Sequence, residues 1–142
     1  MALLKQQEAI CRERGDRAGL KASYGNQALI LKAWGQLGDA IALLQKQEAI
    51  CLELGNRAGL GRSYGNQAAI LNAWGRLEDA MALLKKQEAI CRELGLRNSL
   101  RIGLHNQAIL LEEMGQADEA LRLRAEAEAI QVEMMRGREA SA

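Results

Sequence analysis

Apolar residues recur along the chain at helical spacing, in segments that end at glycines. In residues 37–54 the apolar side chains follow one another at intervals of three and four, as on one face of a helix. Glycine tolerates the left-handed conformation that ends many helices, and proline is absent. The pattern predicts seven helices. They span residues 1–14, 16–34, 37–54, 56–74, 77–94, 97–114 and 117–136.

The helices repeat with a period of 40 residues. The stretch "SYGNQALILKAWG" at 23–35 returns as "SYGNQAAILNAWG" at 63–75, and in weaker form as "GLHNQAILLEEMG" at 103–115. Each period holds two helices, and such a hairpin buries its apolar faces only against its neighbours. We therefore expect residues 1–142 to form one all-α solenoid domain of about three and a half repeats.

The repeat boundaries follow from the glycines. They delimit a half repeat at 1–14, repeats at 15–54, 55–94 and 95–136, and a tail at 137–142 that we expect to fray. Met1 aligns with Ile41, so the sequence begins on the second helix of a repeat. That lone helix is expected to cover the open end of the first hairpin. The last helix is more charged, which is typical of a solvated C-terminal cap.

Composition favours a folded cytoplasmic protein. Hydrophobic residues make up 49% and charged residues 26% of the chain, and the formal net charge is +1. This balance indicates neither a nucleic-acid partner nor an anionic membrane surface. The apolar runs are too short to span a bilayer, and residues 1–14 lack the features of a signal peptide.

Catalytic and metal chemistry find little support in the sequence. Cys11, Cys51 and Cys91 occupy equivalent apolar positions about one hairpin step apart, farther than a disulfide allows. His105 is the only histidine, and no two cysteines are close in sequence, so we expect no metal site and no cofactor. No acid, base and nucleophile recur together, and no phosphate loop is present. We therefore expect a protein that is not an enzyme.

The stretch "GNRAGLGRSYGNQAAILNAWGRLEDAMALLKKQEAI", residues 55–90, resembles a tetratricopeptide repeat. The likeness is to the longer, roughly 40-residue variety of kinesin light chains and Pins-type adaptors. Matching positions include the small Ala68 of the first helix, the turn Gly75 and the small Ala80 of the second helix. The resemblance implies a right-handed α-solenoid that binds protein partners. One departure is glutamine at Gln27, Gln67 and Gln107, where the family usually has leucine.

An asparagine precedes each of these glutamines. The resemblance implies that the first helices line a concave groove, with the asparagines at a pitch of roughly 10 Å. This pitch is near three residues of an extended chain, and an amide offers both a donor and an acceptor to a bound strand. Gly25 and Gly65 are expected to leave space beside the asparagines. The candidate peptide-binding residues are Asn26, Asn66, Asn106, Lys32, Arg62, Asn72, His105, Glu112 and Glu113.

Two interpretations of the amides stay open at this point. They contact a ligand, or they bond to neighbouring helices and hold the repeats in register, since buried polar groups need partners. Two functions also stay open. One is an adaptor that binds an extended peptide. The other is a structural module, engineered or excised from a longer array, whose open ends stack or exchange helices to form homo-oligomers.

Overall fold

The computed structural model describes residues 1–141, which form seven α-helices and no strand. The helices are α1 (Ala2–Arg14), α2 (Arg17–Ala33), α3 (Leu37–Leu54), α4 (Arg57–Ala73), α5 (Leu77–Leu94), α6 (Arg97–Glu113) and α7 (Ala117–Ser141). The expected helices are confirmed, and the two ends of nearly every helix agree closely. The tail is the exception. Residues 137–141 continue α7, whereas the expected helix ended at residue 136, and Ala142 lies outside the described residues.

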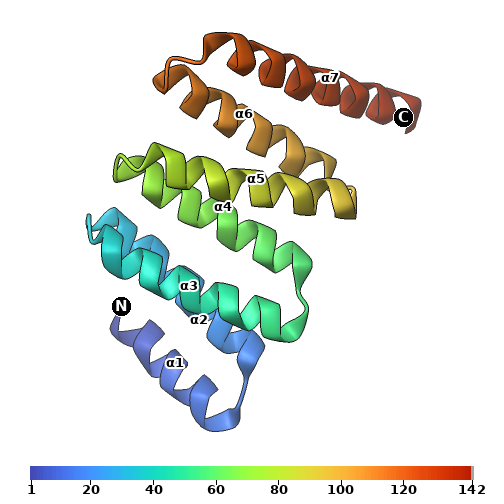
Figure 1. Cartoon of the computed structure of the whole chain (residues 1–142). Coiled ribbons are helices and arrows are strands. Elements are labelled where there is room, and N and C mark those ends of the chain that lie inside the picture. Colours follow the sequence, from blue (N-terminus) through green and yellow to red (C-terminus); the bar gives the residue numbers. More distant parts are fainter. Residues whose placement is uncertain (142) are drawn as a thin grey trace.

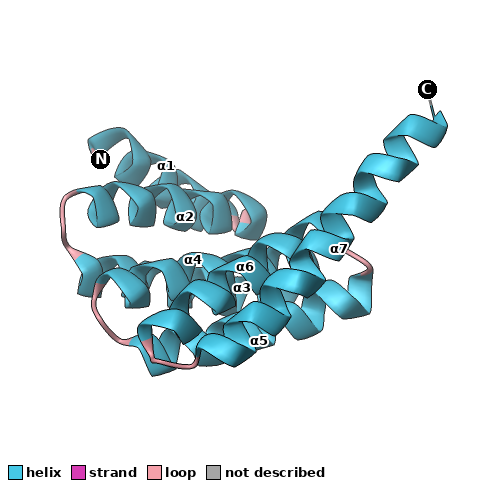
Figure 2. Ribbon diagram, turned by 90° about the horizontal axis from the view of Figure 1, so that it is seen from above, coloured by secondary structure: helices cyan, strands magenta, loops and turns pink. Residues whose placement is uncertain are grey.

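The helices stack in chain order from α1 to α7 (Figure 1). The hairpins are α2–α3, α4–α5 and α6–α7, and the second helix of each packs on the first helix of the next. In Figure 1, α2 and α4 lie partly behind α3 and α5. Seen from above, the C-terminal part of α7 projects beyond the neighbouring helices (Figure 2). Because substantial contacts join only consecutive helices, the fold is a one-dimensional stack.

Small residues set how closely the helices of a hairpin approach. Ala40, Ala80 and Ala120 are completely buried at equivalent positions of α3, α5 and α7. The core continues through apolar side chains such as Leu44 and Leu104, which the neighbouring helices cover. Because each hairpin buries its apolar face on the next, the repeats stabilise one another.

The breaks between helices follow from local chemistry. Gly55 ends α3 in the left-handed region at φ 67°, where a side chain would be strained. The next residue, Asn56, caps α4, because its Oδ1 accepts a 2.9 Å hydrogen bond from the Gly59 amide. Asp16 caps α2 in the same way, whereas Leu96 before α6 forms no side-chain cap. The breaks therefore recur with the period of the sequence.

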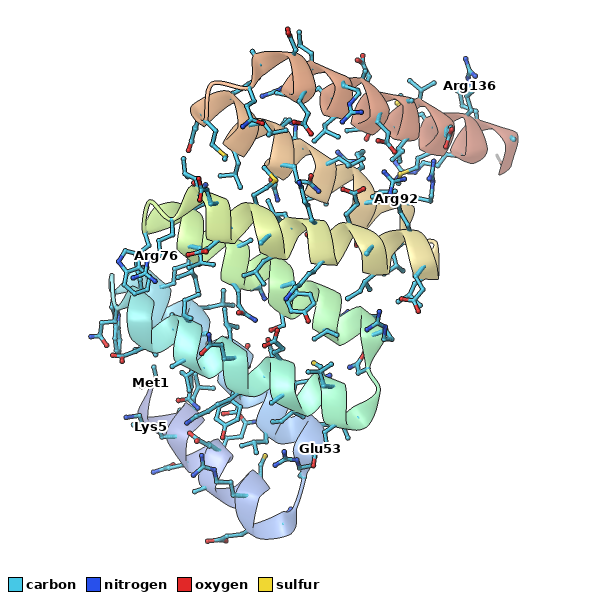
Figure 3. All side chains as sticks on the ribbon, viewed as in Figure 1. Met1, Lys5, Glu53, Arg76, Arg92 and Arg136 are labelled. Atoms are coloured by element: carbon cyan, nitrogen blue, oxygen red, sulfur yellow. The ribbon has the colours of Figure 1, made fainter. Side chains whose placement is uncertain are left out.

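Exposed ion pairs join the helices along one edge. Arg17 pairs with Glu53, and the pair Arg57–Glu93 repeats this contact one unit later at 2.8 Å. In Figure 3, Glu53 and Arg76 lie at opposite edges of the stack, and Arg76 marks the edge of the turns within hairpins. Because both partners of each pair are about half exposed, these pairs contribute little to stability individually.

Candidate binding groove on the first helices

The three asparagines form a row of solvent-facing amides on α2, α4 and α6. Asn26, Asn66 and Asn106 are all exposed. Hydrogen bonds within residues 1–141 leave their side-chain amides unused, although many other polar side chains are paired. An exposed amide keeps both its donor and its acceptor for water or for a ligand. The row is therefore open to solvent over three successive hairpins.

The adjacent glutamines have the opposite environment. Gln27, Gln67 and Gln107 are 3%, 4% and 2% exposed. Gln107 Nε2 on α6 donates a 2.8 Å hydrogen bond to Oε1 of Glu88 on α5, and Gln27 reaches Glu8 of α1 at 3.1 Å. These bonds cross from the first helix of one hairpin to the second helix of the hairpin before it. Gln27 and Gln107 therefore link neighbouring repeats, whereas Gln67 bonds to Ser63 of its own helix at 3.3 Å.

Two serines strengthen the same contact between repeats. Ser23 Oγ donates to the Leu4 carbonyl at 3.1 Å, and Ser63 Oγ donates to the Leu44 carbonyl at 3.2 Å. Each serine also accepts a hydrogen bond from the glutamine four residues later on its own helix. The third repeat has Gly103 at this position, and there Gln107 depends on Glu88 instead. The interpretation of the glutamines as stacking residues agrees with these bonds.

The expected space beside Asn26 is filled by a glutamine side chain, so the expectation for Gly25 was wrong, and at Gly65 a glutamine side chain occupies part of the space. A Cβ on Gly25 would lie 2.6 Å from Nε2 of Gln47, and a Cβ on Gly65 would lie 2.5 Å from Nε2 of Gln87. The glycines thus make room for glutamine side chains of the second helices. Gln47 uses that room to donate a 3.1 Å hydrogen bond to the Lys21 carbonyl. Both glycines thus serve packing within the hairpin, and Gly65 also lines a hollow at the surface.

A hollow does exist one helical turn farther along. It has a volume of about 270 Å³ and spans α2, α4 and α6, with Leu84 of α5 contributing to its wall. Gly65, Ala68 and Ala69 line it from α4. Its remaining lining comes from Lys32, Asn72, Asn106, Ile109 and Leu110. The hollow therefore has an apolar wall and a rim of one ammonium group and two amides.

The candidate residues do not all meet at this hollow. Lys32, Asn72 and Asn106 line it together. Asn26 and Asn66 are exposed on the same row of neighbouring helices. Arg62 is exposed on the first half of α4, away from the hollow's lining.

The α6 candidates lie in separate environments. His105 lines a different hollow of about 430 Å³ between α6 and α7, together with Arg101 and Arg124. Glu112 is held by Arg124 at 2.9 Å. Glu113 is exposed and has no ion pair within residues 1–141.

Ala69 is the residue that sequence reasoning missed. It shares its repeat position with Leu29 and Ile109, so two bulky side chains flank one small one. The sequence contains this signal, because a change of side-chain size at one position of a repeat predicts a local hollow. The position of Leu84 behind that hollow is visible only once the helices are placed.

Electrostatics do not add a reactive group. Burial raises the pKa of the Cys51 and Cys91 thiols, so their nucleophilic thiolate forms are disfavoured at neutral pH. Hydrogen bonds to Glu126 and Glu88 raise the pKa of Arg92, whose side chain extends from α5 to Glu126 of α7 (Figure 3). No group of three or more metal-ligating side chains occurs among the described residues. The groove thus offers hydrogen bonds, apolar contact and isolated charges.

Among the solved structures that this fold matches, three with a probability of 1.00 illustrate the likeness. One is a crystal structure of a putative kinesin light chain of Podosopora anserina with nearly identical TPR-like repeats (26% identity, TM-score 0.76). The others are BtubC from P. vanneervenii (18%, 0.77) and aspartyl phosphate phosphatase F from Bacillus subtilis (20%, 0.79). The alignments cover 95%, 92% and 83% of this chain in that order. The chain is thus a helical-repeat protein of the tetratricopeptide type.

The extent of these matches differs between the two partners. This chain spans 67% of the kinesin light chain structure, 56% of BtubC and 31% of the phosphatase. No protein-family model and no curated protein matches the sequence. Within residues 1–141, no helix has both the length and the apolar character needed to cross a membrane.

Proposed function

We propose that this chain is a non-enzymatic interaction scaffold that holds an extended protein segment in the groove over α2, α4 and α6. The observation that carries the proposal is the exposed row of Asn26, Asn66 and Asn106, whose amides have no partner among the described side chains. The structural need for amides is already met by the buried glutamines beside them. The asparagines are thus free to pair with a ligand backbone.

Spacing supports an extended ligand. One hollow is lined from α2, α4 and α6 together, so the first helices of successive hairpins lie near one another. We take the step between them as roughly 10 Å from typical helix packing distances, which about three residues of an extended chain cover. Successive asparagines then pair with peptide units of the ligand that are three residues apart. Each hairpin thus supplies the ligand backbone with one hydrogen-bond donor and one acceptor. A scaffold of the tetratricopeptide type, such as the one described above, generally engages protein partners. Three unpaired thiols fit a reducing compartment, and we propose the cytoplasm.

Peptide selection followed by a matched variant tests this function. Linear peptides selected from a random displayed library are titrated by fluorescence anisotropy against the parent and against the triple variant N26A/N66A/N106A. Three lost neutral hydrogen bonds predict a loss of affinity of about tenfold or more. The control is Asn98→Ala, which changes an exposed asparagine of α6 outside the row. Equal affinity in parent and triple variant contradicts the proposal, as does a selection that yields no binder.

Self-association is the second candidate, and one observation favours it. Leu3 and Ile10 of α1 are 79% and 49% exposed, so this end of the stack presents apolar surface. At the other end, Arg124 takes the place of Leu84, which disfavours continued stacking there. Light scattering over a wide concentration range decides between a constant monomer mass and a rising one. A rising mass that Leu3→Glu suppresses supports association through α1.

A further inference from the structure

Beside the asparagine row, the small side chain of Ala69 leaves room for one side chain of a bound ligand. Leu29 is 57% exposed and Ile109 is partly buried, and between them stands the small Ala69. The hollow of about 270 Å³ lies at this point. Several waters at roughly 30 Å³ each would fill it, so it has room for an aliphatic side chain. Ala69 and Ile109 offer apolar contact to an occupant, with Leu84 and Leu110 almost completely buried behind them.

A positive charge stands at the rim of the hollow. Lys32 reaches it from α2 and forms no ion pair within residues 1–141. Asn72 of α4 has the equivalent position one repeat later, and Glu112 has it two repeats later. The groove therefore changes charge along its length, from lysine through a neutral amide to glutamate.

The opposite end carries a negative charge that the fold does not use. Glu112 is held by Arg124, whereas Glu113 is exposed and has no ion pair within residues 1–141. Both lie in the last turn of α6, where negative charge opposes the helix dipole. The residues equivalent to Glu113 in the first two repeats are Ala33 and Ala73. Glu113 therefore weakens its own helix slightly and leaves its carboxylate available to a ligand.

We infer that the groove selects a segment with an aliphatic anchor flanked by an acidic residue on one side and a basic residue on the other. The inference rests on the proposed function and names the chemistry of its ligand. The anchor fills the hollow at Ala69, the acidic side chain meets Lys32, and the basic side chain meets Glu113. One hairpin step on either side of the hollow corresponds to about three residues of an extended chain.

Four peptide pools test the charge pattern. Each pool has leucine, isoleucine, valine or methionine at the centre, and glycine, serine and threonine elsewhere. The residues three before and three after the centre are glutamate and lysine, two glutamates, two lysines or two glutamines. Fluorescence anisotropy with the parent protein is expected to favour the mixed pool over both like-charged pools by about fivefold. Because the pattern is mixed, either chain direction satisfies it.

Reversing the charge at either end of the groove is expected to change which peptide pool binds best. With Lys32→Glu both ends of the groove are negative, and the lysine–lysine pool is expected to bind best. With Glu113→Lys both ends are positive, and the glutamate–glutamate pool is expected to bind best. Both side chains are exposed, so the variants keep the fold. An unchanged ranking of pools in both variants overturns the charge assignment.

Filling the hollow tests the anchor. Ala69→Leu places in the second repeat the residue that the first repeat already has at Leu29, and it is expected to weaken all four pools at least tenfold. Ala89→Leu makes the same change at an exposed position of α5 outside the hollow and is expected to leave binding unchanged. Unchanged affinity in the Ala69 variant overturns the anchor assignment.

The triple asparagine variant distinguishes failure of the charge inference from failure of the proposed function. Binding that N26A/N66A/N106A abolishes, but that is equal for all four charge patterns, overturns the charge inference and leaves the proposed function standing. Binding to the parent that is unaffected by the triple asparagine variant contradicts the proposed function itself. Absence of binding by every pool, together with failure of the random library, contradicts both.

Discussion

The side-chain amide of Gln87 on α5 occupies the space above Gly65 on α4, where a Cβ would lie only 2.5 Å from Nε2. The first repeat has the same pair in Gly25 and Gln47. In the third repeat, His105 faces a hollow that it shares with Ala127, the residue aligned with Gln87. A large residue on one helix is thus matched by a small one on its partner.

This compensation predicts a rescue between two positions. Gly65→His is expected to destabilise the fold by about 1–3 kcal/mol, because the imidazole overlaps the Gln87 side chain. Adding Gln87→Ala reproduces the small partner of the third repeat, and the double variant is expected to recover much of the loss. Urea denaturation of the parent, both single variants and the double variant gives the coupling free energy. If the losses of unfolding free energy in the two single variants simply add in the double variant, the proposed size match between positions 65 and 87 is contradicted.

The buried thiols predict how stability depends on alkaline pH. Burial raises the pKa of Cys51 and Cys91 above the unfolded value of about 9. The folded state therefore binds their protons more tightly, and the associated stability is full below the unfolded pKa. It is lost as pH rises through the folded pKa. Urea midpoints are expected to fall from pH 7 to pH 10.

A cysteine-free control isolates that effect from other groups that titrate at alkaline pH. In the variant C51A/C91A the fall in the urea midpoint between pH 7 and pH 10 is expected to be smaller than in the parent. An equal fall in both proteins assigns the pH dependence to groups other than these thiols.

The exposed ion pairs predict a small effect. Arg57 and Glu93 approach to 2.8 Å, yet both side chains are about half exposed to solvent. A double-mutant cycle with R57A and E93A is expected to give a coupling free energy below about 1 kcal/mol, and added salt should reduce it further. A coupling of several kcal/mol, insensitive to salt, contradicts this account of the repeated edge pairs.

Much of the fold was predictable because the repeat places the same local signals at the same positions. Gly55 predicts the end of one helix and Asn56 predicts the beginning of the next. In the structure Gly55 ends α3 and Asn56 caps α4. The end of α7 was not predictable in this way. Gly137 was expected to end the helix as the other glycines do, but it does not take a positive φ, and α7 continues to Ser141.

The site was harder to predict, because it depends on which helix faces each residue. The sequence places Asn26 and Gln27 side by side, but only packing shows that the glutamine is buried against Glu8 while the asparagine is exposed. The glycine at Gly25 was misread because its neighbour, Gln47, comes from another helix. The hollow at Ala69 likewise needs α2, α4 and α6 in place.

The central claim is that the asparagines serve binding while the glutamines stabilise the fold. Free energies of unfolding test this claim most directly. Urea denaturation is measured for the parent, for N26A/N66A/N106A and for Q27A/Q67A/Q107A. The asparagine variant is expected to match or exceed the parent, because exposed asparagines lose no contact and alanine favours helix. The glutamine variant is expected to lose several kcal/mol, at about 1–3 kcal/mol for each buried amide. A glutamine variant as stable as the parent, with an asparagine variant that unfolds, contradicts the account and makes the asparagine row structural.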